Sequence, residues 1–84
     1  MLIHVWNLSP NVSEDNFRRV FETFGQVNFA VISFTILKDR SSGWSRTFAF
    51  VEMPDQAEAQ EAIKNLNRKH LSGQQMILYG SSEN

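Results

Sequence analysis

The chain has 84 residues, which is enough for one compact domain with a single core but too few for two domains. It contains no cysteine, which excludes disulfides and thiolate metal sites and gives no reason to expect an oxidising compartment. Eight Lys and Arg against nine Asp and Glu give a net charge of −1, so binding by overall phosphate neutralisation is disfavoured and a nucleic-acid partner would need a local site.

The sequence also bears on where the protein acts. No stretch approaches the roughly 18 consecutive apolar residues of a membrane-spanning helix. Met1 leads straight into an alternating apolar pattern, with neither a charged leader nor a small-residue cleavage site. We therefore expect an unprocessed, cytoplasmic protein that has no membrane partner.

A strand is predicted over residues 2–8, because apolar residues recur there at every second position. Ile3 and Val5 fall on one side of this strand, and His4 and Trp6 fall on the other. The alternation indicates that one side is buried against a core while the other faces outward.

An amphipathic helix is predicted next. Ser13 is a favourable N-cap, and Val12 and Phe17 have the spacing of a hydrophobic staple. Apolar side chains at helical spacing form its buried stripe: Phe17, Val20, Phe21 and Phe24. Gly25 is a typical residue at which such a helix ends.

Two strands joined by a hairpin connection are predicted in the middle of the chain. β-branched and aromatic residues dominate residues 31–37 and recur over residues 46–53, with a polar run at 38–43 between them. We expect these strands to pair antiparallel. The preceding connection, Gln26 to Ala30, either extends the first of the two strands or forms a bulge.

A second helix is predicted after Pro54. Asp55 and Glu58 have the spacing of a capping box. The apolar stripe of this helix consists of Ala59, Ala62, Ile63 and Leu66. A final strand is predicted from Met76 to Tyr79.

The order of elements is therefore β-α-β-β-α-β, which predicts an α+β, ferredoxin-like sandwich. Its four-stranded antiparallel sheet should carry both helices on one face and leave the other face open. We expect residues 1–80 to form this domain and residues 81–84 to form a short tail.

The second strand of the hairpin carries the clearest functional signal. Ala49, Val51 and Met53 should point toward the helices. Phe48 and Phe50 must then stand on the open face, where solvent would otherwise be expected. At this strand the sequence resembles the RNA recognition motif family, whose octamer reads Lys/Arg, Gly, aromatic, Gly/Ala, aromatic, aliphatic, any, aromatic. The matching residues are Arg46, Phe48, Ala49, Phe50 and Val51.

The first strand resembles the companion hexamer of that family. Residues 3–8 read Ile-His-Val-Trp-Asn-Leu, with His4 in the aromatic position. The segment 71–73 before the last strand also fits, so the resemblance covers nearly the whole chain. Thr47 replaces the octamer glycine and Met53 its last aromatic. A lone domain of this kind is similar to the small bacterial members of the family.

The resemblance implies binding of single-stranded RNA, because an open sheet with aligned aromatic rings is a platform for stacking bases. By analogy with the family, His4 and Phe50 would each stack a base, Phe48 would lie against sugars and Arg46 would contact a phosphate. Trp6 would add a further stacking surface, and Lys38 with Arg40 would provide a basic edge. The predicted RNA-binding residues are His4, Trp6, Leu37, Lys38, Arg40, Arg46, Phe48, Phe50 and Tyr79.

A protein-interaction or self-association module of the same fold is the alternative, because the open face would be unusually apolar. The residues that make it so are Trp6, Leu37, Phe48, Phe50, Ile77 and Tyr79. No strained turn, glycine-rich loop or carboxylate pair suggests catalysis, so we expect a non-enzyme without metal or cofactor. Single-stranded DNA is a further candidate ligand, and we expect a monomer.

Overall fold

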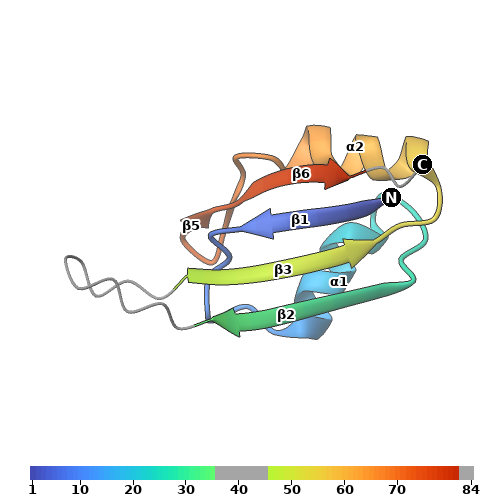
Figure 1. Cartoon of the computed structure of the whole chain (residues 1–84). Coiled ribbons are helices and arrows are strands. Elements are labelled where there is room, and N and C mark those ends of the chain that lie inside the picture. The colour runs from blue at the N-terminus through green and yellow to red at the C-terminus, as the bar shows by residue number, and fades with distance from the viewer. Residues whose placement is uncertain (36–45, 82–84) are drawn as a thin grey trace.

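The computed structural model describes residues 1–35 and 46–81, which form two layers: an antiparallel sheet and a pair of helices packed on one of its faces (Figure 1). In chain order the elements are β1 (Leu2–Trp6), α1 (Glu14–Glu22), β2 (Phe29–Thr35), β3 (Arg46–Glu52), α2 (Gln56–Leu66), β4 (His70–Leu71), β5 (Gln74–Gln75) and β6 (Ile77–Ser81).

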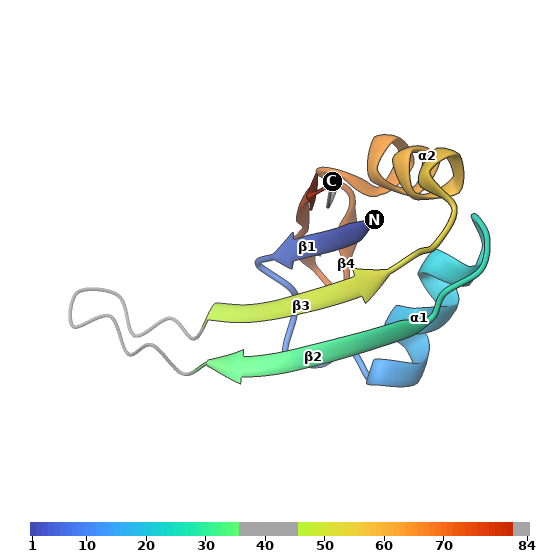
Figure 2. The same cartoon turned by 45° about the vertical axis from the view of Figure 1, so that its right-hand side comes forward.

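The main sheet has four strands in the order β2-β3-β1-β6, and all neighbouring strands run antiparallel. Both helices lie on the same side of it, as the view turned by 45° shows (Figure 2). This arrangement confirms the predicted ferredoxin-like α+β fold. Neither α1 nor α2, the helices of the described residues, is long and apolar enough to cross a membrane.

The core lies between the sheet and the helices, and strand alternation determines its composition. Ile3 and Val5 of β1 are buried, as are Ala49 and Val51 of β3. From the helices, the most deeply buried side chains are those of Phe17, Phe21, Ala59 and Ala62. These positions agree with the apolar patterns of the sequence, because period two in the strands and period 3.6 in the helices aim both sets at one layer.

The predicted helix caps form, with one difference in their partners. Ser13 Oγ accepts a hydrogen bond from the backbone N–H of Asn16 at 3.2 Å, and Asp55 Oδ1 accepts one from that of Glu58 at 3.0 Å. The capping box predicts that the Glu58 carboxylate returns to the backbone of Asp55. Instead, Glu58 Oε1 accepts from the backbone N–H of Gln26 at 3.3 Å. The carboxylate thereby ties α2 to the segment that leads into β2.

The connection after α1 extends the strand. β2 begins at Phe29, two residues earlier than the apolar pattern predicts, and its first residues pair with Glu52 and Val51 of β3. The backbone N–H of Asn28 donates to the carbonyl of Glu52 at 2.9 Å, which continues the pairing by one further bond. Of the two alternatives for residues 26–30, the strand extension is therefore the one that occurs.

A small hairpin, β4 and β5, precedes the last strand and is missing from the sequence prediction. Its two-residue loop consists of Ser72 and Gly73, with φ angles of 51° and 85°. Positive φ at both central positions is typical of the type I′ turns that suit two-residue hairpins. β6 also runs beyond the predicted end at Tyr79, because Gly80 and Ser81 pair with β1. The strand thus reaches one residue into the segment expected to be a tail.

The tight packing at Ala49 yields a test of the fold. Ala49 is 1% exposed, so Ala49→Leu should overpack the core and lower the free energy of unfolding by about 1–3 kcal/mol. Val31→Leu, at an exposed position of neighbouring β2, is the matched control and should change stability by less than about 0.5 kcal/mol. Urea denaturation followed by circular dichroism measures both. Equal stability of the two variants would show that Ala49 does not face a packed layer.

Candidate functional site

Five ring side chains gather on the face of the sheet that the helices leave open, and we refer to them as the aromatic platform. They are His4, Trp6, Phe48, Phe50 and Tyr79. The rings come from the two central strands and from β6, and strand alternation places them opposite the buried side chains of the same strands. The platform thus follows from the same pattern that builds the core.

His4 lies at the centre of the platform. The strand register places it between Phe50 of β3 and Tyr79 of β6. Its ring stacks on that of Tyr79, with centroids 4.7 Å apart and planes at 7°, and meets the ring of Phe50 edge-on at 5.2 Å and 78°. His4 Nε2 is hydrogen-bonded to Ser81 Oγ at 3.1 Å. Contacts on three sides therefore fix the orientation of the imidazole.

Trp6 occupies the neighbouring row. Its indole packs edge-on against Phe48, with centroids 4.3 Å apart at 87°, and lies 6.4 Å from Tyr79 at 22°. The residue remains 37% exposed. A pocket on this face is lined by the rings of His4, Trp6, Phe48 and Phe50, together with Val5 and Ala49. The indole thus borders an apolar hollow and still presents surface to the solvent.

The structure brings together five of the nine residues predicted to bind RNA: His4, Trp6, Phe48, Phe50 and Tyr79. Leu37, Lys38 and Arg40 lie outside the described residues. Arg46 is the first residue of β3 and pairs with Thr35, but its side chain is also outside the described part of the chain.

Phe29 and Glu52 are among the residues of the open face that were not predicted to belong to the site. Phe29 is 45% exposed at the start of β2, and Glu52 faces it across the strand pair. The position of Phe29 could have been predicted from strand alternation. Once the strand is extended by two residues, Phe29 falls on the same face as Val31 and Ser33. Glu52 is two residues beyond Phe50 and shares its face for the same reason.

The platform offers planar π surface and carries little charge. Among the sheet-face side chains that the structure describes, Glu52 is the one acidic residue, and none is a lysine or an arginine. Within residues 1–35 and 46–81, no group of three or more His, Asp or Glu side chains is placed to hold a metal ion. Exposed rings of this kind can stack on flat, unsaturated ligands such as nucleobases.

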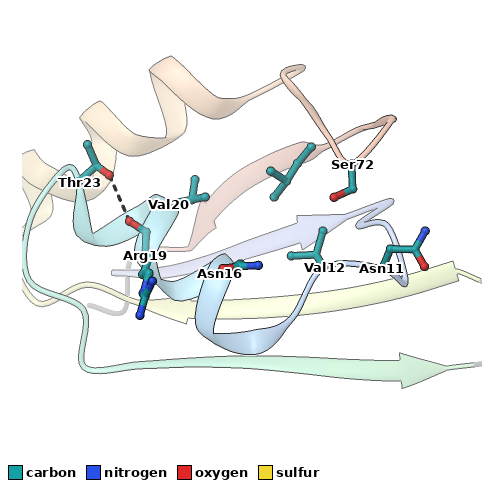
Figure 3. Close-up of a pocket in the computed structure, with 8 residues that line it drawn as sticks. Asn11, Val12, Asn16, Arg19, Val20, Thr23 and Ser72 are labelled. Carbon is teal, nitrogen blue, oxygen red and sulfur yellow. Dashed lines mark hydrogen bonds between the residues drawn. The ribbon is translucent and has the colours of Figure 1, made fainter.

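A second pocket lies on the opposite side of the sheet, between α1 and the β4–β5 hairpin (Figure 3). Its lining includes Asn11, Asn16, Arg19, Val20, Thr23 and Ser72. Thr23 Oγ1 donates to the carbonyl of Arg19 at 3.1 Å, so this hydroxyl caps the C-terminal end of α1. The lining contains neither a carboxylate nor an imidazole, and the ring surfaces lie on the other face.

Comparison with known proteins matches this geometry to one family. A sequence model described as RNA recognition motif matches residues 3–77. Glycine-rich RNA-binding protein 1 of Mycosarcoma maydis is 39% identical over 74 residues, which is 88% of this chain and 40% of that protein. The chain spans well under half the length of the curated relatives that it matches.

Solved structures agree on the fold. The crystal structure of RNA binding protein PG1 has a TM-score of 0.80 and 33% sequence identity, and the match covers 100% of this chain and 96% of that one. The structure of the Rna15 RRM with bound RNA has a TM-score of 0.76 at 22% identity, covering 98% of this chain and 83% of that one. The family match over residues 3–77 includes both strands from which the central rings project, so the chain belongs to the RNA recognition motif family.

Proposed function

We propose that the chain binds single-stranded RNA on the aromatic platform. The observation that carries the proposal is the position of His4, which lies between Phe50 and Tyr79 on the helix-free face of a domain of this family. Bases of a single strand are unpaired and present π faces to such rings, whereas a duplex hides them. The RNA-binding relative from Mycosarcoma maydis supports the same ligand class.

Each ring has a proposed role. His4 and Phe50 stack consecutive bases, Phe48 lies against the sugar between them, and Trp6 stacks a further base. Each stack contributes about 1–3 kcal/mol, whereas micromolar affinity requires about 8 kcal/mol. Two stacks are insufficient on this scale, and a third at Trp6 brings stacking close to that total. We propose that Tyr79, whose ring stacks on that of His4 from the neighbouring strand, holds the imidazole in position.

Flanking contacts supply the remainder. We propose that Arg46 contacts a phosphate, that Lys38 and Arg40 form a basic edge and that Leu37 extends the apolar surface. With a net charge of −1, the whole molecule has little long-range attraction to RNA, so we propose that these cations contribute by local contacts.

The platform also bears on whether the protein is an enzyme or a binding protein. We propose a binding protein rather than an enzyme, because the exposed rings provide recognition surface, and the imidazole of His4, which is hydrogen-bonded to Ser81 Oγ, packs against Tyr79 and Phe50 as part of that surface. We further propose that it acts as a monomer in the cytoplasm. Single-stranded DNA is a weaker candidate ligand, since the stacking surface accepts bases of either nucleic acid.

Phe50 provides the direct test of stacking. Phe50→Ala should weaken binding of a short mixed-sequence single-stranded RNA by about 1–3 kcal/mol, because the variant loses one ring from the platform. Phe50→Tyr is the matched control and should retain most of the affinity, since its π face is preserved. Fluorescence anisotropy with labelled RNA measures the affinities, and circular dichroism checks folding. Unchanged affinity in a folded Phe50→Ala variant would contradict the stacking assignment.

A protein-binding face is the second candidate, and the exposure of its apolar residues favours it. Trp6, Ile77 and Tyr79 are all exposed on neighbouring strands. Contiguous exposed apolar surface commonly marks a protein interface. RNA remains the preferred ligand, because the exposed groups are predominantly rings and the central one is an imidazole.

Trp6 separates the two functions. In a Trp44→Phe background, RNA binding predicts a change in Trp6 emission when RNA is added, and Trp6→Ala should weaken binding by about 1–3 kcal/mol. Trp6→Phe should restore most of the affinity. If the face binds protein instead, adding RNA should leave the Trp6 emission unchanged, and neither the parent nor the variants should bind RNA. Trp6→Ala should then abolish self-association or a partner complex. Fluorescence titration and analytical ultracentrifugation distinguish these results.

A further inference from the structure

The open face continues beyond the aromatic platform to the end of the sheet where β1 begins. In that last row, Phe29 of β2 lies opposite Glu52 of β3, which in turn lies opposite Leu2 of β1. Glu52 is two residues from Phe50, a separation of about 7 Å along a strand. The row therefore adjoins the ring that is proposed to stack a base.

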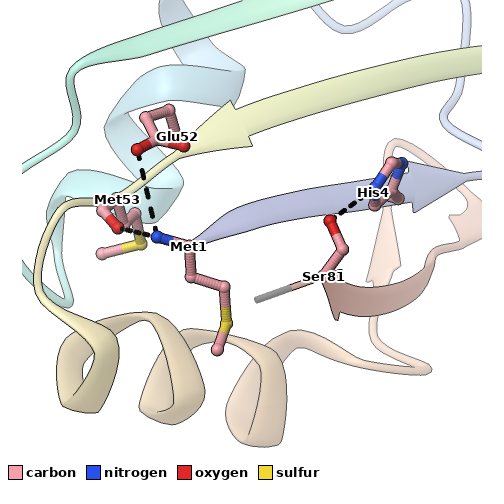
Figure 4. Close-up of polar contacts among 5 residues, drawn as sticks. All are labelled: Met1, His4, Glu52, Met53 and Ser81. Atoms are coloured by element: carbon pink, nitrogen blue, oxygen red, sulfur yellow. Dashed lines mark hydrogen bonds and ion pairs between the residues drawn. The ribbon is translucent and has the colours of Figure 1, made fainter. Parts of the chain in front are cut away.

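Glu52 projects a carboxylate from a half-covered position on this face. Its side chain is 29% exposed, and Oε1 lies 3.9 Å from the terminal ammonium of Met1 (Figure 4). The same ammonium group donates a hydrogen bond to the carbonyl of Met53 at 2.8 Å. The carboxylate is thus flanked by a positive charge, while part of its surface remains open to a ligand.

Phe29 supplies the second half of the arrangement. Its ring is exposed at the edge of the sheet, directly across the strand pair from Glu52. A base that stacks on this ring would direct an edge toward the carboxylate. This pair therefore combines the π face of Phe29 with the carboxylate acceptor of Glu52, whereas every member of the aromatic platform is a ring.

We infer that Phe29 and Glu52 form a base subsite that selects guanine, an inference that rests on the proposed RNA binding. An ionised carboxylate has only acceptors. Guanine presents two adjacent donors, N1–H and N2–H, on its Watson–Crick edge, and the two carboxylate oxygens can accept both. Such bidentate pairs discriminate strongly between bases.

The other bases fit this acceptor poorly. Uracil has a single N3–H between two carbonyl oxygens, which repel a carboxylate. On their Watson–Crick edges, adenine and cytosine each place a ring-nitrogen acceptor beside the exocyclic amine, so the second carboxylate oxygen would face a lone pair. Phosphates are repelled as well, which favours approach by a base edge over approach by the RNA backbone.

The test compares short oligouridines that carry one central guanine, inosine, adenine or cytosine with plain oligouridine. Uridine flanks allow the strand to shift until the central base reaches the subsite. We expect the guanine oligomer to bind the parent about tenfold or more tightly than plain oligouridine. Inosine lacks the N2 amine, so it should lose most of that advantage.

Glu52→Gln replaces one acceptor oxygen by a donor at the same size. We expect it to abolish the guanine preference, and plain oligouridine should bind at least as tightly as it does to the parent, because the repulsion of its carbonyl oxygens and phosphates is removed. Glu61→Gln is the matched control for lost charge, since Glu61 is an exposed carboxylate on α2. It should keep the preference.

The outcomes separate the inference from the proposed function. A parent that binds every oligomer equally well contradicts the guanine subsite and leaves RNA binding intact. A guanine preference that persists in Glu52→Gln also overturns the inference. A parent that binds none of the oligomers contradicts RNA binding itself, and the guanine subsite with it.

Discussion

Strand alternation under a one-sided helical layer is the constraint on which the rest of the structure depends. Helices α1 and α2 cover one face of the sheet, so Ile3 and Ala49 are buried beneath them. Their strand neighbours His4 and Phe50 must then stand on the uncovered face. The core and the aromatic platform are therefore two consequences of a single pattern, and a one-residue slip of either strand would destroy both.

Much of this arrangement can be predicted from the sequence, because alternation and helical spacing are local signals. They give the fold and the outward direction of Phe48, Phe50 and Trp6. The contacts among rings depend on strand order and register, which the chain specifies only through tertiary packing. His4 and Tyr79 are distant in sequence, and their stack at 4.7 Å follows from pairing of β1 with β6. The β4–β5 hairpin escaped prediction because its strands are two residues long and lack an apolar pattern.

The open face combines rings with sparse charge, which suits recognition of base faces better than retention of a phosphate backbone. A chain of net charge −1 has little long-range attraction to RNA, so stacking must supply most of the affinity. A carboxylate at such a face is unfavourable for phosphates and favourable for donor-bearing base edges. In the inferred guanine subsite, Glu52 beside the platform is the selective element. Its neighbour Phe29 could not be assigned to the open face from the sequence, because β2 begins two residues before the apolar pattern predicts.

The central claim is that single-stranded RNA occupies the helix-free face, and residue-resolved amide chemical shifts test it most directly. Titration of the uniformly labelled chain with a short mixed-sequence single-stranded RNA should shift the amides of His4, Phe50 and Tyr79 together with their strand neighbours. The exposed amides of α2, on the covered side, should remain unchanged. Absence of shifts in β1 and β3 at millimolar RNA, or shifts confined to the helical side, would contradict the account.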